Sequence, residues 1–276
     1  MTGLLPDLYL RKGAQRRLRG GHLWVYSNEV DSQRSPLGSF QAGDPVRVCS
    51  ASGQVLGSAY MQPRSLICAR LSAPGEVRLP DPALFHARLQ GALALREAAF
   101  AAPYYRLVYG DSDTLPGVVI DRFGDYLVVQ LNNAGIERYR EPLLDALLAL
   151  LRPAGVLLRG DSRARREQDL ASAGQVVHGE VPEVVPLHEN GVRFLAPVHT
   201  GQKTGWFYDH RMARARLASW VAGRTVLDVY SYIGGWGIQA GASGASSVCC
   251  LDSSQAALDG VLVNAELNNL AERVTT

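Results

Sequence analysis

The chain has 276 residues, a formal net charge of +2 and 47% hydrophobic residues. This length leaves room for two or three domains, each with an apolar core. A charge so close to zero gives no argument for nucleic acid by itself. The four cysteines lack the spacing of a zinc site, and no apolar stretch is typical of a signal peptide or a membrane span. We therefore expect a reduced, cytoplasmic protein with neither a metal nor a membrane as partner.

The strongest local excess of charge lies in residues 11–22. This segment has no acidic residue, and its basic residues are Arg11, Lys12, Arg16, Arg17 and Arg19. One interpretation is a solvated basic turn. The other is a patch that contacts RNA phosphates, because each neutralised phosphate releases counterions and favours binding. The pattern leaves both interpretations open.

Residues 1–75 contain short runs in which apolar and polar residues alternate. Glycines and prolines separate these runs, which are HLWVYSNEV (22–30), DPVRVCS (44–50), QVLGSAYM (54–61) and SLICARL (65–71). Short strands with turn signals between them predict a small β-barrel or sandwich. A linker is expected at 74–82.

Residues 76–198 mix helices and strands, which predicts an α+β domain. Asp81-Pro82 marks a helix start, with Asp81 as N-cap and Pro82 in the first turn. Asn190-Gly191 predicts the turn of a hairpin over 184–198, because both residues accept the positive φ of a tight turn. Further strands are predicted at YRLVYG (105–110), GVVIDRF (117–123), YLVVQL (126–131) and VLLRGD (156–161), and a Leu-rich helix at 141–151.

From about residue 200 onward, strands and helices alternate. The apolar run Val226-Leu227 ends in Asp228, a turn containing three glycines follows, and Asp252 comes 24 residues after Asp228. This pattern is typical of a nucleotide-type cofactor site at the carboxyl ends of two parallel strands, where the second acid binds ribose hydroxyls. The phosphate-binding GxGxxG is missing and an acid follows the strand directly, which favours a positively charged cofactor. S-adenosylmethionine fits best.

The segment before this motif, HTGQKTGWFYDHR (199–211), is dense in polar and aromatic residues. It is either a polar loop that enters a helix at 212–220 or a lid over the cofactor. As a lid it would place Phe207 or Trp206 against an adenine, and Thr204 or Lys203 near the polar end of the ligand.

Two segments together, GQKTGWFYDHR (201–211) and VLDVYSYIGGWG (226–237), resemble a family of bacterial ribosomal RNA methyltransferases that methylate cytosine at carbon 5. GHLWVYSNEV (21–30) resembles the start of that family's N-terminal PUA domain, a small RNA-binding barrel. Residues 105–130 resemble its central domain. The resemblance implies a multi-domain fold, with a PUA-like β-barrel (1–75), an α+β central domain (76–198) and part of an α/β Rossmann-like methyltransferase domain (199–276).

The resemblance also implies S-adenosylmethionine as cofactor and ribosomal RNA of the large subunit as partner. The residues that match the family's cofactor motifs are Gln202, Lys203, Thr204, Gly205, Phe207, Asp209, Arg211, Asp228, Ser231, Tyr232, Gly234, Gly235 and Asp252.

The cysteines do not fit the family's reaction. Methylation at carbon 5 needs a thiolate that adds to carbon 6 and a base that removes the displaced proton. In the family these cysteines lie in later motifs, so the catalytic cysteine is expected beyond residue 276. Cys249 and Cys250 precede the cofactor acid, which is the wrong place for the nucleophile. The resemblance therefore predicts a C-terminally truncated and inactive methyltransferase.

Two alternatives stay open. The first is guanine methylation within the same family, which needs no thiolate because the base nitrogen attacks directly. The second is an RNA-binding protein in which the methyltransferase remnant serves as a scaffold. The oligomeric state is also open, and a homodimer is one candidate.

Overall fold

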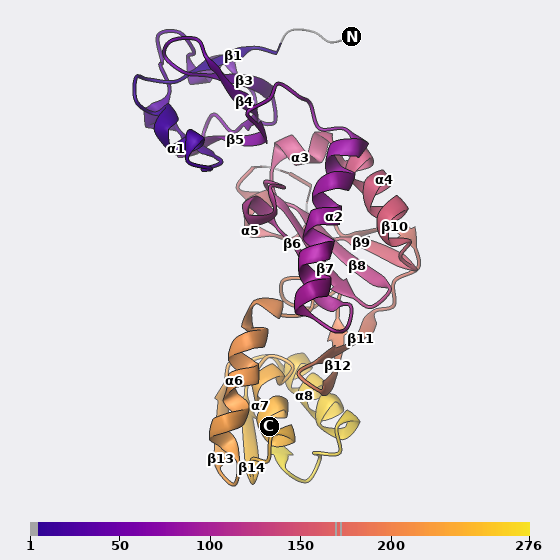
Figure 1. The fold of residues 1–276 in the computed structure, drawn as a ribbon. Helices are drawn as coiled ribbons and strands as arrows, with labels where there is room; N and C mark the ends of the chain where they lie inside the picture. The colour runs from indigo at the N-terminus through magenta and orange to yellow at the C-terminus, as the bar shows by residue number, and fades with distance from the viewer. Residues whose placement is uncertain (1–4, 169, 172) are drawn as a thin grey trace.

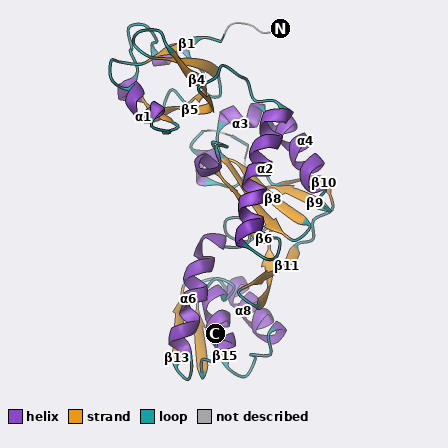
Figure 2. Ribbon diagram, in the orientation of Figure 1, coloured by secondary structure: helices purple, strands orange, loops and turns teal. Residues whose placement is uncertain are grey.

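The computed structural model describes residues 5–168, 170–171 and 173–276. Figure 1 shows three units that follow one another along the molecule in the order of the sequence. Figure 2 shows that each unit combines strands with helices. Within the described part of the chain, no helix is long and apolar enough to cross a membrane.

The N-terminal unit is a five-stranded sheet in the order β1-β3-β4-β5-β2. The sheet does not close into the barrel that the sequence predicted. Among the described residues, a single bridge, Leu10–Val30, joins the regions of the two edge strands. The edges are too short to close the sheet, since β1 and β2 have three residues each. The elements are β1 (Asp7–Tyr9), α1 (Gln15–Arg19), β2 (Trp24–Tyr26), η1 (Ser27–Glu29), η2 (Leu37–Ser39), β3 (Pro45–Cys49), β4 (Val55–Met61) and β5 (Ile67–Pro74).

The central unit is a five-stranded mixed sheet in the order β10-β9-β8-β7-β6, in which β8 and β9 are parallel. Helices α2 and α4 lie together over one face of it (Figure 1). Its elements are α2 (Pro82–Ala99), β6 (Tyr104–Tyr109), η3 (Gly110–Asp113), β7 (Val118–Phe123), β8 (Tyr126–Leu131), α3 (Ala134–Arg138), α4 (Arg140–Leu151), β9 (Gly155–Leu158), α5 (Arg163–Arg166) and β10 (Gln175–Gly179).

The middle strands of this sheet are buried on both faces. On β8, Val128 packs toward the C-terminal unit, while Leu127 and Val129 pack toward the helices. This double burial explains why the sequence of β8 is a continuous apolar run and not an alternating one. Strand β10 was not predicted from the sequence, because its side chains are mostly exposed and show no apolar periodicity.

Two local predictions are confirmed. The Asp81 carboxylate accepts a hydrogen bond of 2.7 Å from the backbone N–H of Leu84 and caps α2. The hairpin β11 (Val184–Glu189) and β12 (Val192–Pro197) turns at Asn190 and Gly191, whose φ angles are +53° and +82°. In both cases the side chain or backbone of the turn itself determines the local structure.

The C-terminal unit has a parallel three-stranded sheet in the order β13-β14-β15. The parallel pairing of β13 with β14 confirms the βα alternation predicted from the sequence. Strand β13 is an edge of this sheet, and its Leu227 and Val229 are 61% and 49% exposed. The elements are η4 (Tyr208–His210), α6 (Arg211–Val221), β13 (Thr225–Val229), α7 (Gly235–Ala242), β14 (Ser247–Leu251), α8 (Gln255–Leu267) and β15 (Val274–Thr275).

Candidate cofactor site

A cavity of about 350 Å³, here called the cofactor cavity, lies at the carboxyl ends of β13 and β14. This is the edge at which open α/β sheets bind their ligands. Six residues matched from the sequence line it: Gln202, Phe207, Ser231, Tyr232, Gly235 and Asp252. Six further residues complete its lining: Trp206, His210, Arg214, Tyr230, Trp236 and Ser253.

The loop between β13 and α7 holds an unusual backbone conformation. Tyr230, Tyr232 and Gly234 have φ angles of +63°, +51° and +81°. Two non-glycine residues in the left-handed region of one loop carry strain, which is frequent at binding sites. Gly234 is the N-cap of α7, and a Cβ there would lie 2.9 Å from the Ile238 side chain. These conformations determine the path of the loop at the edge of the cavity, which Tyr230, Ser231 and Tyr232 line.

Asp252 ties this loop to the end of β14. Its Oδ2 accepts a hydrogen bond of 2.9 Å from the backbone N–H of Tyr232, and its Oδ1 accepts one of 3.0 Å from Ser254. A carboxylate oxygen can accept more than one hydrogen bond. Asp252 lines the cofactor cavity, so its remaining lone pairs are available to the hydroxyl groups of a ligand.

Asp228 lies beneath the loop and does not line the cavity. Its Oδ2 accepts a hydrogen bond of 2.9 Å from the N–H of Gly237, in the first turn of α7. Burial raises the pKa of Asp228, the Gly237 N–H lowers it, and the nearby Asp252 raises it again. A Cβ on Gly237 would lie 2.5 Å from the Cys250 sulfur, so glycine is required where the helix passes over β14.

The segment before the cavity divides between two surroundings. Gln202 and Phe207 face the cavity, whereas Thr204 is fully buried and donates a hydrogen bond to Asp121 of β7. Asp121 also pairs with Arg106 at 2.9 Å. Thr204 thus ties this segment to the central sheet. It does not line the cavity, whereas the sequence predicted it near the polar end of the cofactor.

Three other residues of the segment also lie away from the cavity. Lys203 and Asp209 form an ion pair at 2.9 Å, and Arg211 donates a 2.7 Å hydrogen bond to the Tyr104 carbonyl. Burial acts to raise the pKa of Asp209, but the Lys203 ammonium prevails and holds that pKa below its ordinary value. The roles of these three residues and of Thr204 in cofactor binding stay predictions.

A buried polar cluster behind the cavity was not predicted from the sequence. Glu189, at the end of β11, is fully buried and pairs with the Arg214 guanidinium at 2.6 Å. It also accepts hydrogen bonds of 3.0 Å from the Trp206 indole and 2.8 Å from the Gln239 amide. The cluster fixes Trp206 and Arg214, two walls of the cavity. The alternation of Val185, Leu187 and Glu189 places Glu189 on the buried face of β11, but this period-2 pattern does not identify its partner Arg214.

The five basic residues predicted to contact RNA lie in or near α1 and are all exposed. Arg17 pairs with Glu29 at 3.3 Å and stacks over the Tyr26 ring at 4.6 Å, and Arg11 donates to the Val30 carbonyl. Arg19 donates to the Gln54 side chain. Three of the five basic residues thus have partners within the N-terminal unit, and all five remain exposed.

The four cysteines are unpaired by disulfides, and none lines the cofactor cavity. Cys250 is buried, and burial raises the pKa of its thiol to about 12, with Asp228 and Cys249 adding to the effect. A thiol with that pKa stays protonated and is a poor nucleophile.

Among the described residues, no group of three or more His, Cys, Asp or Glu could hold a metal ion.

Comparisons with known proteins agree with this architecture. Residues 8–73 match a PUA-like domain, and residues 152–274 match an S-adenosylmethionine-dependent methyltransferase family. The chain is 37% identical over 270 residues to the ribosomal RNA large subunit methyltransferase I of Erwinia tasmaniensis, which covers 95% of this chain and 67% of the relative. The chain belongs to this methyltransferase family. The relative of the same name from Aliivibrio fischeri is 36% identical over 266 residues, covering 95% of this chain and 66% of the relative.

The fold of this methyltransferase chain is also found in solved structures. It is similar to a Streptococcus mutans chain assigned as a SAM-dependent methyltransferase, with a TM-score of 0.83 and 24% identity over 98% of this chain and 70% of that one. A chain assigned as a methyltransferase and complexed with SAH gives a TM-score of 0.83 and 24% identity over 98% and 69%.

These findings confirm the family predicted from the sequence, its PUA-like and methyltransferase units and its S-adenosylmethionine cofactor. The chain spans about two-thirds of the length of the curated relatives it matches. The expected truncation and inactivity are not established by these comparisons and stay predictions.

Proposed function

We propose that this methyltransferase transfers a methyl group from S-adenosylmethionine to large-subunit ribosomal RNA. The observation that carries the proposal is the half-buried Asp252 carboxylate beside a left-handed loop at the carboxyl ends of two parallel strands. The substrate follows from the names of the relatives, which are 36–37% identical over 95% of the chain.

The lining of the cofactor cavity fits S-adenosylmethionine. Asp252 would hold the ribose hydroxyls, and the aromatic rings of Phe207 and Trp236 offer faces for adenine and for the sulfonium cation. When bound, the cofactor supplies an electrophilic methyl group. The residues of this chain orient the cofactor, and the buried Glu189–Arg214 pair keeps the wall behind it rigid.

RNA binding is proposed for the N-terminal unit. Its exposed basic residues, Arg11, Lys12, Arg16, Arg17 and Arg19, lie in the region that matches the PUA-like domain. They would contact phosphates and position the RNA with little base specificity.

Cytosine carbon 5 is the proposed methylation site, as in the family that the cofactor motifs resemble. Guanine methylation is the second candidate, because the cofactor cavity contains no cysteine among the described residues and nitrogen methylation requires none. Analysis of the methylated nucleoside by mass spectrometry separates 5-methylcytidine from a methylated guanosine.

Isothermal titration with S-adenosylmethionine and a tritiated-methyl assay on large-subunit ribosomal RNA test the proposal. Micromolar cofactor binding with methyl transfer would support the proposed function. The predicted inactivity of residues 1–276 is the competing expectation: β13 is a sheet edge with exposed apolar side chains beside the site, which would weaken cofactor binding and prevent methyl transfer. Micromolar binding with turnover would refute the predicted inactivity. A complete absence of both cofactor binding and RNA binding would refute the proposed function.

A further inference from the structure

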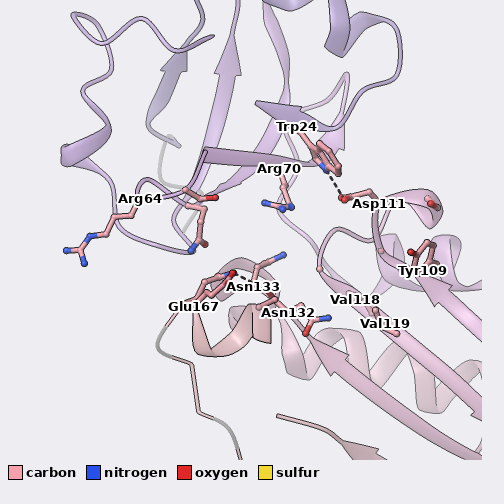
Figure 3. A pocket seen from close by; sticks show the side chains of 17 residues that line it. Trp24, Arg64, Arg70, Tyr109, Asp111, Val118, Val119, Asn132, Asn133 and Glu167 are labelled. Carbon is pink, nitrogen blue, oxygen red and sulfur yellow. Dashed lines mark hydrogen bonds between the residues drawn. The ribbon is translucent and has the colours of Figure 1, made fainter. Parts of the chain in front are cut away.

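A second cavity, of about 650 Å³, lies between the N-terminal sheet and the central sheet (Figure 3). We call it the junction cavity. Trp24, Arg64 and Arg70 come from the N-terminal unit, while Tyr109, Asp111 and Asn133 come from the central unit. The Trp24 indole donates a 2.8 Å hydrogen bond to Asp111 across the junction. This volume is within the range of cavities that hold small ligands or single nucleotides.

The polar groups of the junction cavity are incompletely satisfied by the protein. The Arg70 guanidinium points into the cavity and donates no hydrogen bond to any described residue (Figure 3). Burial lowers the pKa of Arg70, and the Asp111 carboxylate opposes this effect. The second oxygen of Asp111 is buried without a hydrogen-bond partner among the described residues. A buried polar group without a hydrogen-bond partner in a folded protein needs an explanation, and a bound ligand would provide one.

Tyr109 provides an aromatic surface at the wall of this cavity. Its side chain is 57% exposed at the end of β6. The Arg106 guanidinium lies 5.4 Å from the centre of its ring and is itself held by Asp121. A ring supported in this way can stack with a nucleic acid base, and such stacking tolerates any base because every base has a π-face.

Tyr109 is shared by the junction cavity and a further cavity. It lines a third cavity, of about 330 Å³, which we call the middle cavity. The middle cavity is walled by Phe100, Arg211 and Asp209, and the Arg211 guanidinium stacks on the Phe100 ring at 4.3 Å. The same turn of chain, residues 207–211, contributes Phe207 and His210 to the cofactor cavity. The junction and middle cavities share Tyr109, and residues 207–211 contribute to both the middle and the cofactor cavities, which gives a candidate route from the N-terminal unit to the cofactor cavity.

We infer that an unpaired RNA nucleotide occupies the junction cavity, with its phosphate beside Arg70 and its base stacked on Tyr109, and that the strand continues over the middle cavity toward the cofactor. This inference rests on the proposed function. A single strand fits the route because its bases are free to stack on aromatic rings, whereas bases inside a duplex are already stacked and paired.

Fluorescence anisotropy with a short fluorescent single-stranded RNA and with an RNA duplex tests the inference on the full chain. The variants are Tyr109→Ala, Tyr109→Phe and Arg70→Gln. Matched controls are Trp220→Ala and Arg216→Gln, which remove an exposed aromatic and an exposed cation on α6, outside all three cavities.

Tyr109→Ala should weaken single-strand binding about 5- to 150-fold, the effect of one lost base–aromatic stack. Tyr109→Phe should retain wild-type affinity, because the ring persists. Arg70→Gln should reduce the slope of log affinity against log salt by about 0.7, the value for one phosphate on a single strand. Duplex binding, thermal stability and the two control variants should match the wild type.

Wild-type affinity of Tyr109→Ala and Arg70→Gln for single strands would overturn the inference and leave the proposed function intact. Equal losses for the single strand and the duplex would also overturn it, since the cavity would then not select an unpaired nucleotide. Failure of the wild-type chain to bind either RNA would overturn the proposed function as well.

Discussion

The cofactor cavity and the junction cavity are assembled in different ways. Every residue that lines the cofactor cavity falls within residues 202–253, and most belong to two continuous segments. The lining of the junction cavity is scattered from Trp24 to Gln168 and comes from both the N-terminal and the central unit. A sequence motif therefore identifies the cofactor cavity, whereas the junction cavity forms only where the N-terminal and central units pack together.

The difference affects how each cavity responds to change. The cofactor cavity depends on the backbone of one loop, so a single substitution in that loop directly changes the affinity for the ligand. A site between units depends on the contacts that hold the units together, such as the Trp24–Asp111 hydrogen bond. Four variants test this comparison, from the largest expected effect to the smallest.

Charge reversal in the basic segment should have the largest effect. Replacing Arg16, Arg17 and Arg19 by Glu should abolish retention of both single-stranded and duplex RNA in a filter-binding assay, because three cations near phosphates become anions. Circular dichroism checks that the N-terminal unit remains folded.

The matched control for this reversal is the same change at Arg216, Arg224 and Arg273, which are exposed on the C-terminal unit. Loss of duplex binding with the first triple variant alone would separate general phosphate contact from the selective junction cavity. Unchanged retention would show that the basic segment is a solvated turn.

Glu189→Gln tests how much the buried polar cluster behind the cofactor cavity contributes to the stability of the folded chain. The change leaves Arg214 buried without a counter-charge, and removal of one partner of a buried ion pair costs about 3–5 kcal/mol. Urea unfolding measures the loss. The exposed Glu183→Gln on the neighbouring segment is the control and should stay within about 0.5 kcal/mol of the wild type. A neutral Glu189→Gln would mean that the cluster contributes little to stability.

Asp252→Ala removes a carboxylate that lines the cofactor cavity. A hydrogen bond to a charged group contributes about 1.5–3 kcal/mol, so cofactor binding should weaken roughly tenfold or more. Isothermal titration at high protein concentration measures this change even when binding is weak. Asp259→Ala, an exposed acid on α8, should bind as the wild type does. Equal affinity of Asp252→Ala and the wild type would exclude the ribose contact.

The smallest expected effect is a pH dependence at Asp228. Its pKa in the folded chain is raised above the ordinary value of 3.8, mainly by burial. The folded state therefore holds this proton more tightly, and the resulting stability is fully present below the unfolded pKa and is lost as pH rises through the folded pKa.

Asp228→Asn should remove this component while keeping an oxygen for the Gly237 N–H. Thermal unfolding across the acidic range should show the variant gaining stability relative to the wild type as pH rises. Asp259→Asn should show no such trend. A constant difference between Asp228→Asn and the wild type would indicate that Asp228 titrates alike in both states.

Local rules explain which elements could be predicted. The Asp81 cap and the Asn190-Gly191 turn are determined within a few residues, and both are confirmed. The β13–loop–α7 arrangement follows from an apolar run, an acid and closely spaced glycines. Strand β10 could not be predicted because its side chains are mostly exposed and show no apolar periodicity. The incomplete closure of the N-terminal sheet could not be predicted because its edge strands pair with partners about forty residues away in the sequence.

The sequence by itself determined the family, the cofactor and the positions of Asp228 and Asp252, since a cofactor loop requires particular residues at fixed spacing. The tertiary structure decided where the neighbouring side chains went. It turned Thr204 toward Asp121, buried Glu189 against Arg214, and brought Arg70 and Tyr109 to one cavity. The physical reason is that burial and pairing of polar groups depend on which surfaces pack together. The partner of a buried polar side chain cannot be deduced from the spacing of residues along the chain.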